Sequence, residues 1–378
     1  MRENSSKKKY PLWFRLLVPF LEKRKYPAMP KNPSRNNWYR IYPEECVGAD
    51  GAPTHAQFYL GTENKLIVFF CGGGFSINEY TAARPVNYFD GDASDMFYTL
   101  GMDLVSDIVT WKGILSKNKE NPFANWSKIC IPYDTGDFHV GNNDFPYTAL
   151  DGSKQILHHH GYKNYRAIMD IVKKMVVNPE DMIVCGCSAG AFGTAMITDD
   201  VMSLYPECKN VVCLVDSALS ISSEFHRITK EVWGAPEEIV NRIHSDNFVL
   251  DSLTALKRNH GDKVTCLYTS SLKDAALARM QNFMDGGKLV FLKESGERLY
   301  KDNQRFCNQL KENIPNVGIY LFNKADDSLK GMELTVHCII GENFFFKDKV
   351  EDTTCATWVE DAVLGKVSSY GLRLLEHK

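Results

Sequence analysis

Short, unbroken apolar runs recur along the chain and predict buried β-strands. Six of them are rich in β-branched or aromatic residues: 66–70 (LIVFF), 128–132 (KICIP), 182–185 (MIVC), 211–215 (VVCLV), 264–269 (VTCLYT) and 317–322 (VGIYLF). A strand with one wet face alternates apolar and polar residues, whereas these runs are largely continuous. We therefore expect strands covered on both faces, as in a parallel sheet.

Helix-compatible segments separate these runs. Residues 162–176 (YKNYRAIMDIVKKMV) carry apolar side chains near helical spacing. Strands and helices in alternation predict an α/β fold with a mostly parallel, doubly wound sheet. The segment 222–262 is longer than a simple crossover needs and contains one or two helical stretches. We expect it to be a helical lid insertion over the strand ends, and a helix packed on the sheet is the alternative.

Length and charge narrow the class of protein. With 378 residues, the chain can bury a large core, and we expect a basic N-terminal arm (1–32) followed by a single domain (33–378). The net charge of −3 does not indicate a nucleic-acid partner. Residues 1–31 alone carry nine Lys or Arg against two Asp or Glu, so the remainder has a net charge of −10.

The apolar part of the arm is interrupted by Arg15 and Pro19, so it is too short to span a bilayer. It is not followed by a small-residue cleavage site, so we do not expect a signal peptide. The arm either packs on its own domain or makes a weak contact with a membrane surface.

The chain has eleven cysteines, most of them single residues inside apolar runs, and no C-x-x-C pair. This pattern predicts reduced thiols that act as small core residues rather than zinc ligands. A reducing compartment, and hence a cytoplasmic location, fits best.

Residues 182–196 (MIVCGCSAGAFGTAM) contain the clearest catalytic motif. They place Gly186-x-Ser188-x-Gly190 between a predicted strand and a predicted helix, which is the context of a nucleophile elbow. The glycines allow a sharp turn that exposes Ser188, and the amide of Ala189 then points at the developing oxyanion. A turn that serves only packing is the alternative. Cys187 should point away and pack.

A glycine-rich turn follows the first predicted strand, in LIVFFCGGGFS. The amides of Gly73 and Gly74 can approach a substrate closely and stabilise an oxyanion. A phosphate-binding loop is excluded because no Gly-Lys-Ser/Thr follows. A purely structural turn stays possible.

A nucleophilic serine needs a base and an orienting acid, and in this architecture they follow it in the order acid, then His. His337, in MELTVHCIIG, comes after the last predicted strand and a polar loop, where the base belongs. Asp216 and Asp274 each follow a strand and compete for the acid, with topology weakly favouring Asp274. Asp216 could instead tie down a loop by accepting backbone hydrogen bonds.

Taken together, these blocks resemble the pectin acetylesterase/Notum family of serine hydrolases, in a bacterial-type form without a signal peptide. The resemblance runs in order from about residue 66 to residue 338, through FFCGGGF, YDTGD, GYKNYRAIMDIV, GCSAGAFGTAMITDD, CLVDSAL, SSLKDAAL and VHC. It implies an α/β-hydrolase fold that cleaves carboxylic esters, either acetyl groups on pectin or a fatty acyl group on a secreted signalling protein.

Carried over residue by residue, the resemblance assigns the site as follows. The nucleophile falls on Ser188, the acid on Asp274 and the base on His337, with oxyanion donors at Gly73, Gly74 and Ala189. Phe75-Ser76 stands where the family usually has Trp-Cys or Trp-Tyr, so Phe75 becomes a candidate substrate-wall residue. His139 either lines the site or holds a loop.

The sequence therefore predicts a serine carboxylesterase that removes acetyl or other short acyl groups from a carbohydrate or small alcohol. It would work through an acyl-enzyme on Ser188, without a metal or organic cofactor. The alternatives are a membrane-surface lipid esterase or acyltransferase, and a catalytically inactive binding protein on the same scaffold.

Overall fold

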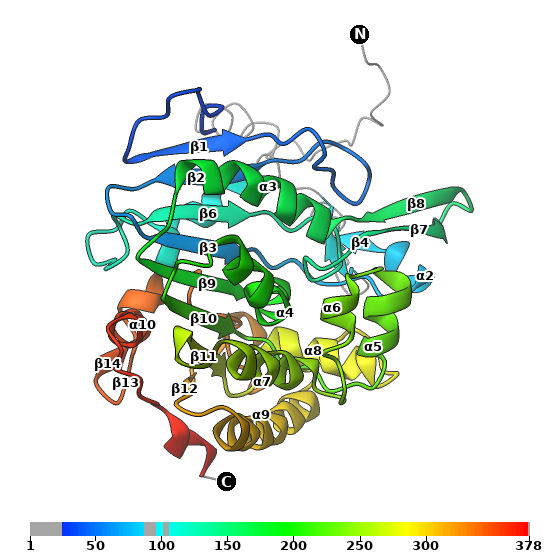
Figure 1. Cartoon of the computed structure of the whole chain (residues 1–378). Helices are drawn as coiled ribbons and strands as arrows, with labels where there is room; N and C mark the ends of the chain where they lie inside the picture. Colours follow the sequence, from blue (N-terminus) through cyan, green and yellow to red (C-terminus); the bar gives the residue numbers. More distant parts are fainter. Residues whose placement is uncertain (1–24, 87–95, 101–105, 377–378) are drawn as a thin grey trace.

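The computed structural model describes residues 25–86, 96–100 and 106–376, and a central sheet of eight strands forms its frame (Figure 1). The spatial order is β1 (Asn37–Ile41), β2 (Ala56–Leu60), β6 (Ser127–Ile131), β3 (Leu66–Phe70), β9 (Asp181–Cys187), β10 (Asn210–Asp216), β11 (Val264–Ser271) and β12 (Gly318–Phe322). β2 is antiparallel to both neighbours, and every pair from β6 to β12 is parallel. All six predicted strands belong to this sheet.

Burial on both faces explains the continuous apolar runs. In β9, Met182 and Val184 contribute to one apolar core, and Ile183 and Cys185 contribute to a second core on the opposite face. All four side chains are fully buried. Since successive side chains of a strand point to opposite faces, a strand covered on both sides is apolar at most positions.

Helices cover the two faces unequally. α3 (Gly161–Met175), α4 (Ala189–Leu204), α7 (Phe248–His260) and α9 (Lys293–Asn313) contribute to the first core, in front of the sheet in Figure 1. α10 (Cys355–Val363) contributes to the second core through Trp358 and Val359. α3 matches the helix predicted over 162–176, and the architecture as a whole is α/β-hydrolase-like.

Shorter elements occupy the connections. They are α2 (Glu79–Ala82), β4 (Pro85–Val86), β5 (Tyr98–Thr99), β7 (Asn143–Thr148), β8 (Lys154–His159), α5 (Phe225–Arg227), a π-helical turn (Ile228–Val232), α6 (Glu237–Val240), α8 (Ala275–Met284), β13 (Lys349–Val350) and β14 (Thr353–Thr354). β7 and β8 pair as an antiparallel hairpin, which extends away from the sheet in Figure 1.

The segment 222–262 forms helices, but they do not lie over the site. α7 packs against α4, and Asp199 of α4 bonds to His260 and Arg242 of the segment. None of residues 222–262, all of which the structure describes, lines the cavity described below. Of these helices, α7 follows the alternative of a helix packed on the sheet, since it contacts α4 and β11, and the expected lid is not seen over the cavity in the described residues.

Two strands of the sheet, β1 and β2, were absent from the sequence prediction because they carry buried polar residues. Arg40 in β1 is 2% exposed and binds Asp107 through Nη2 at 2.9 Å. Gln57 in β2 is also buried and contacts His55. The partner of Arg40 lies far away in the chain, and a local hydrophobic pattern does not reveal such a pairing.

Most of the basic arm, residues 1–24, lies outside the described residues. Its last part packs on the sheet edge, where Ala28 bridges Arg40 and the ring of Tyr26 stacks on Trp38 at 5.7 Å. Within the described ranges, no helix combines the length and apolar character needed to cross a membrane. The division into an arm (1–32) and a domain (33–378) stays a prediction.

Candidate active site

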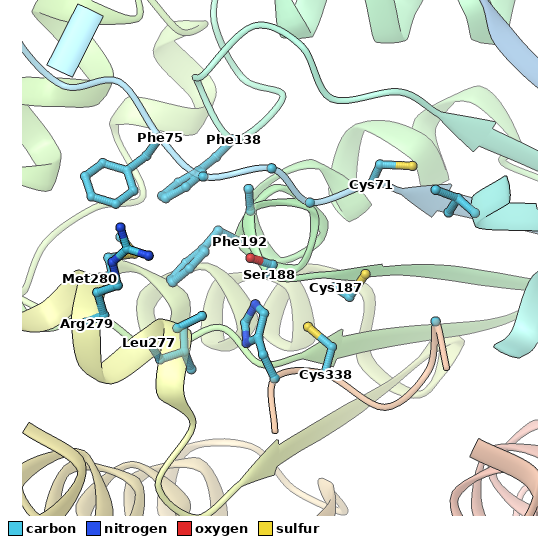
Figure 2. A pocket seen from close by; sticks show the side chains of 18 of the residues that line it. Cys71, Phe75, Phe138, Cys187, Ser188, Phe192, Leu277, Arg279, Met280 and Cys338 are labelled. Atoms are coloured by element: carbon cyan, nitrogen blue, oxygen red, sulfur yellow. The ribbon is translucent and has the colours of Figure 1, made fainter. Parts of the chain in front are cut away.

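The carboxyl ends of the parallel strands meet at one edge of the sheet, and the loops that follow them surround a cavity of about 590 Å³ (Figure 2). Ser188, which follows β9, and His337, which lies beyond β12, both line it. Asp274, after β11, contacts His337. In open α/β sheets, ligands bind at this edge.

Ser188 lies on a sharp turn between β9 and α4. Its φ of 59° and ψ of −129° are unfavourable for a residue with a side chain. A Cβ on Gly186 would overlap the carbonyl of Gly190, and a Cβ on Gly190 would overlap the carbonyl oxygen of Phe70. The spacing of glycines around Ser188 therefore follows from close backbone contact between the turn and β3.

At each of the three glycines after β3, a side chain would collide with a neighbouring residue. A Cβ on Gly72 would lie 2.6 Å from Cβ of Ser188, and one on Gly73 would lie 2.7 Å from Cδ1 of Tyr133. Gly74 has a φ of 84° and would overlap the carbonyl of Phe97. The glycine loop thus lies directly against the Ser188 turn.

Three backbone amides at this junction are available to a ligand. Within the described part of the chain, the N–H groups of Gly73, Gly74 and Ala189 donate no hydrogen bond, and all three residues line the cavity. Ala189 begins α4, where the first amides have no helical acceptor and the helix dipole is positive. This arrangement can bind an oxygen that carries negative charge.

His337 and Asp274 form a buried pair. Nδ1 of His337 lies 2.8 Å from each carboxylate oxygen of Asp274. Asp274 is fully buried and also caps α8, accepting from the amides of Ala276 and Leu277 at 3.0 and 3.1 Å. Nε2 of His337 is buried and has no hydrogen-bond partner among the described residues.

The surroundings of His337 favour its charged form. Burial by itself would lower the pKa of the imidazole, because a low dielectric disfavours charge. The charge and hydrogen bond of Asp274, with a contribution from Asp216, outweigh this effect and raise the His337 pKa. A base in this position can hold a proton between two steps of a reaction.

Asp216 contacts backbone rather than the imidazole. Its Oδ2 accepts from the amides of Ile339 and Ile340, both at 2.8 Å, and its carbonyl oxygen accepts from the amide of Ser188 at 3.1 Å. Burial raises the pKa of its carboxyl to about 6. These contacts match the loop-anchoring alternative left open by the sequence.

The loop that carries His337 is also joined to the loop that carries Asp274. The amide of Thr335 donates to the carbonyl of Lys273, and the amide of Ala275 donates to the carbonyl of Thr335, both at 3.0 Å. Oγ1 of Thr335 donates to Oγ of Ser271 at 2.7 Å. Sequence reasoning missed Thr335, because nothing local distinguishes it from other loop threonines.

The remaining wall of the cavity is mostly apolar (Figure 2). Its larger side chains are Phe75, Met96, Phe97, Phe138, Phe192, Leu277, Met280, Leu289 and Phe291. Arg279 lies over the ring of Phe291 at 4.9 Å and donates to the carbonyl of Leu289 at 3.0 Å. Phe75 lines the cavity, with its ring 5.8 Å from that of Phe97, and its contact with substrate stays a prediction.

The central part of the chain matches a known family. Residues 43–275, more than half of the chain, match the family model for pectinacetylesterase. The chain belongs to the pectinacetylesterase family. The match includes the glycine loop, Ser188 and Asp274, and it ends before His337.

Two proteins of Arabidopsis thaliana illustrate the similarity. Pectin acetylesterase 11 is 29% identical over 182 residues, which is 47% of this chain and 43% of the relative. Pectin acetylesterase 7 is 27% identical over 180 residues, 47% of this chain and 42% of the relative. In both matches the chain covers less than half the length of the relative.

One expectation for this member of the pectinacetylesterase family needs correction. His139 does not line the cavity but is buried behind the glycine loop, with Nε2 2.8 Å from the carbonyl oxygen of Cys71. Its ring packs against Phe70 and Tyr133, and burial lowers its pKa to about 4. A neutral His139 therefore supports the loop from behind.

Cys187 also differs from a simple packing residue. Its side chain lines the cavity with Cys338, and in Figure 2 the sulfur of Cys187 points away from the hydroxyl of Ser188. All eleven cysteines lie in the described part of the chain and are free thiols. Both thiols therefore line the same cavity as Ser188 and His337.

Proposed function

We propose that this protein is a serine carboxylesterase with Ser188 as nucleophile, His337 as general base and Asp274 as the orienting acid. One observation carries the proposal. Asp274 fixes His337 through Nδ1, and Nε2 of His337 has no hydrogen-bond partner among the described residues. His337 and Ser188 line the same cavity. This is the division of roles that nucleophilic acyl transfer requires.

The reaction would proceed through an acyl-enzyme. Asp274 keeps the proton of His337 on Nδ1, so that Nε2 accepts the proton of Ser188 as its oxygen attacks the ester carbonyl. The amides of Gly73, Gly74 and Ala189 would stabilise the oxyanion. His337 then donates its proton to the leaving alcohol and activates the water that releases the acid.

Acetyl esters of a carbohydrate are the proposed substrate class. Support comes from membership of the pectinacetylesterase family and from relatives named as pectin acetylesterases. A cytoplasmic location, proposed from the cysteine pattern, would make a soluble oligosaccharide the natural form of that substrate.

A second candidate is an esterase for longer acyl chains. A cavity of about 590 Å³ with mostly apolar walls is in the range that holds an entire drug-sized ligand, and it is far larger than an acetyl group. This observation favours an apolar acyl group or an apolar alcohol at the site.

Labelling with a fluorophosphonate probe tests the nucleophile. We expect the wild-type protein to label, Ser188→Ala to lose labelling, and Cys187→Ala to label as the wild type does. Equal labelling of wild type and Ser188→Ala would refute the serine mechanism. A wild-type protein that does not label, although folded, would indicate the inactive binding protein.

A panel of acetyl, butyryl, octanoyl and palmitoyl esters separates the substrate classes. Highest kcat/KM on acetyl esters supports the acetylesterase, and a maximum at long chains supports the second candidate. The same panel after removal of residues 1–24 tests the membrane contact of the arm. Long-chain activity that needs these residues and lipid vesicles would favour the membrane-surface enzyme.

A further inference from the structure

A cluster of metal-binding side chains lies on the β7–β8 hairpin, outside the cavity. Oδ1 of Asp144 lies 2.6 Å from Nδ1 of His158 and 2.8 Å from Nε2 of His160. One ligand atom from each of the three residues can be chosen so that all lie within 4.8 Å of one another. We propose that Asp144, His158 and His160 bind a divalent transition-metal ion, with Zn²⁺ the best match.

Backbone pairing fixes the three residues relative to one another. Asp144 of β7 is paired directly with His158 of β8. His160 comes two residues later, immediately before α3, and its amide donates to the carbonyl of His158 at 2.9 Å. His159, between the two ligands, is fully buried and contacts the carbonyl of Thr135 at 2.8 Å through Nδ1. Strand pairing and the buried His159 therefore fix the backbone that carries the proposed ligands.

The donor set suits zinc. Two imidazole nitrogens and one carboxylate oxygen, with water in the fourth position, are a common tetrahedral arrangement for this ion. Metal–ligand distances of about 2.0–2.1 Å place the ligand atoms about 3.3 Å apart. The spacings from Asp144 to His158 and His160 would need to open by about 0.7 and about 0.5 Å, changes that small side-chain rotations supply.

Solvent reaches the cluster from outside. The side chain of Asp144 is 56% exposed, and those of His158 and His160 are 26% and 13% exposed. A Cβ on Gly51 would lie 3.1 Å from Nε2 of His158, so the glycine leaves room for that ring. An ion can therefore enter and keep a water ligand.

One neighbouring charge opposes a cation. Nζ of Lys163 lies 3.5 Å from Nε2 of His160, and the lysine is on the exposed face of α3. Its long side chain can swing into solvent when an ion binds. The bound ion would then link β7, β8 and the start of α3.

Calorimetric titration of the full, chelator-treated chain with ZnCl₂ tests the site. We expect one ion per chain in the wild type and at least about tenfold weaker binding in the double variant His158→Ala, His160→Ala. The matched control is His226→Ala, His244→Ala, two exposed histidines elsewhere, which should bind as the wild type does. Lys163→Met should bind severalfold more tightly.

Two further readouts distinguish this site from thiol binding. Co²⁺ should give a visible spectrum without the intense thiolate charge-transfer band expected for cysteine ligands. Zinc should raise the Tm of the wild type but not of the double variant, because only a folded site that binds the ion gains stability. Equal zinc affinity in wild type and double variant, or no binding to the wild type, would overturn the proposal. Fluorophosphonate labelling tests Ser188 separately, so neither zinc result depends on the proposed esterase function.

Discussion

Two buried aspartates lie near His337, and their hydrogen bonds give them different roles. Asp274 contacts the imidazole of His337 itself. Asp216 contacts the amides of Ile339 and Ile340, which follow His337 in the chain. Asp274 can therefore set the tautomer of His337, whereas Asp216 sets the position of its loop. Removing the charge of each should have unequal effects.

Asp274→Asn should lower kcat by about 10³- to 10⁴-fold, because the amide no longer holds the proton of His337 on Nδ1. Asn is also a good helix N-cap, so the cap of α8 and the fold should be retained. Asp216→Asn keeps an oxygen acceptor for both amides and should lower kcat by about tenfold at most. Steady-state kinetics on a chromogenic ester measures both.

Circular dichroism and thermal melting of each variant provide the control for folding. If Asp216→Asn abolishes turnover while Asp274→Asn does not, the acid has been assigned to the wrong residue.

The raised pKa of His337 predicts where activity is lost in acid. In the proposed mechanism the imidazole must be neutral to accept the proton of Ser188, so kcat/KM should fall as pH drops through its pKa. Because Asp274 and Asp216 raise that pKa, the midpoint of the acid limb should lie above about 6.5, the ordinary value for histidine. A profile from about pH 5 to about pH 9 measures it. A midpoint well below 6.5 would contradict the ion-pair environment.

At the scale of elements, a strand, a turn and a helix define the site by close backbone contact. Gly186 and Gly190 lie against the end of β3, and Gly72 lies against Ser188. No side chain fits at these contacts, so the glycines keep Ser188 in register with the amides of Gly73, Gly74 and Ala189. The unfavourable φ of Ser188 is retained because the neighbouring residues of β9 and β3 hold the turn in place.

Gly190→Ala should destabilise the fold by about 3 kcal/mol or more, because its Cβ would overlap the carbonyl oxygen of Phe70. Gly341→Ala is the matched control, since its Cβ would lie 3.7 Å from Sγ of Cys187, an ordinary contact. Urea unfolding of both variants measures the difference. Equal stability of the two would show that β3 does not constrain the turn.

At the scale of the whole molecule, the segment 222–262 supports the cavity wall from behind. Phe138 and Phe192 line the cavity and stack at 4.5 Å. Trp233 packs on Phe138 at 5.0 Å, and Phe248 packs on Phe192 at 5.5 Å. The segment therefore supports the cavity wall through packing and does not line the cavity itself.

Phe248→Leu should cost about 1 kcal/mol of stability and let Phe192 move away from the cavity. We expect KM to rise about three- to tenfold, with kcat within about twofold, since the triad is untouched. Phe306→Leu is the control, because Phe306 is equally buried but packs on Tyr268, away from the cavity. If both variants change KM alike, the effect is general and not transmitted through the wall.

Features that depend on local patterns can be predicted from the amino-acid sequence alone. Six strands, helix α3, the Ser188 turn and the glycine loop follow from continuous burial and from backbone conformations that require glycine. These requirements act over a few residues, so a single sequence records them directly.

The tertiary structure alone decided which distant groups meet. β1 contains the buried Arg40, which its distant partner Asp107 explains, and the placement of 222–262 depends on contacts with α4. The different contacts of Asp216 and Asp274, and the position of His139 behind the loop, depend on hydrogen bonds between segments far apart in the chain. Such bonds follow from the order of strands in the sheet, and a local pattern does not encode that order.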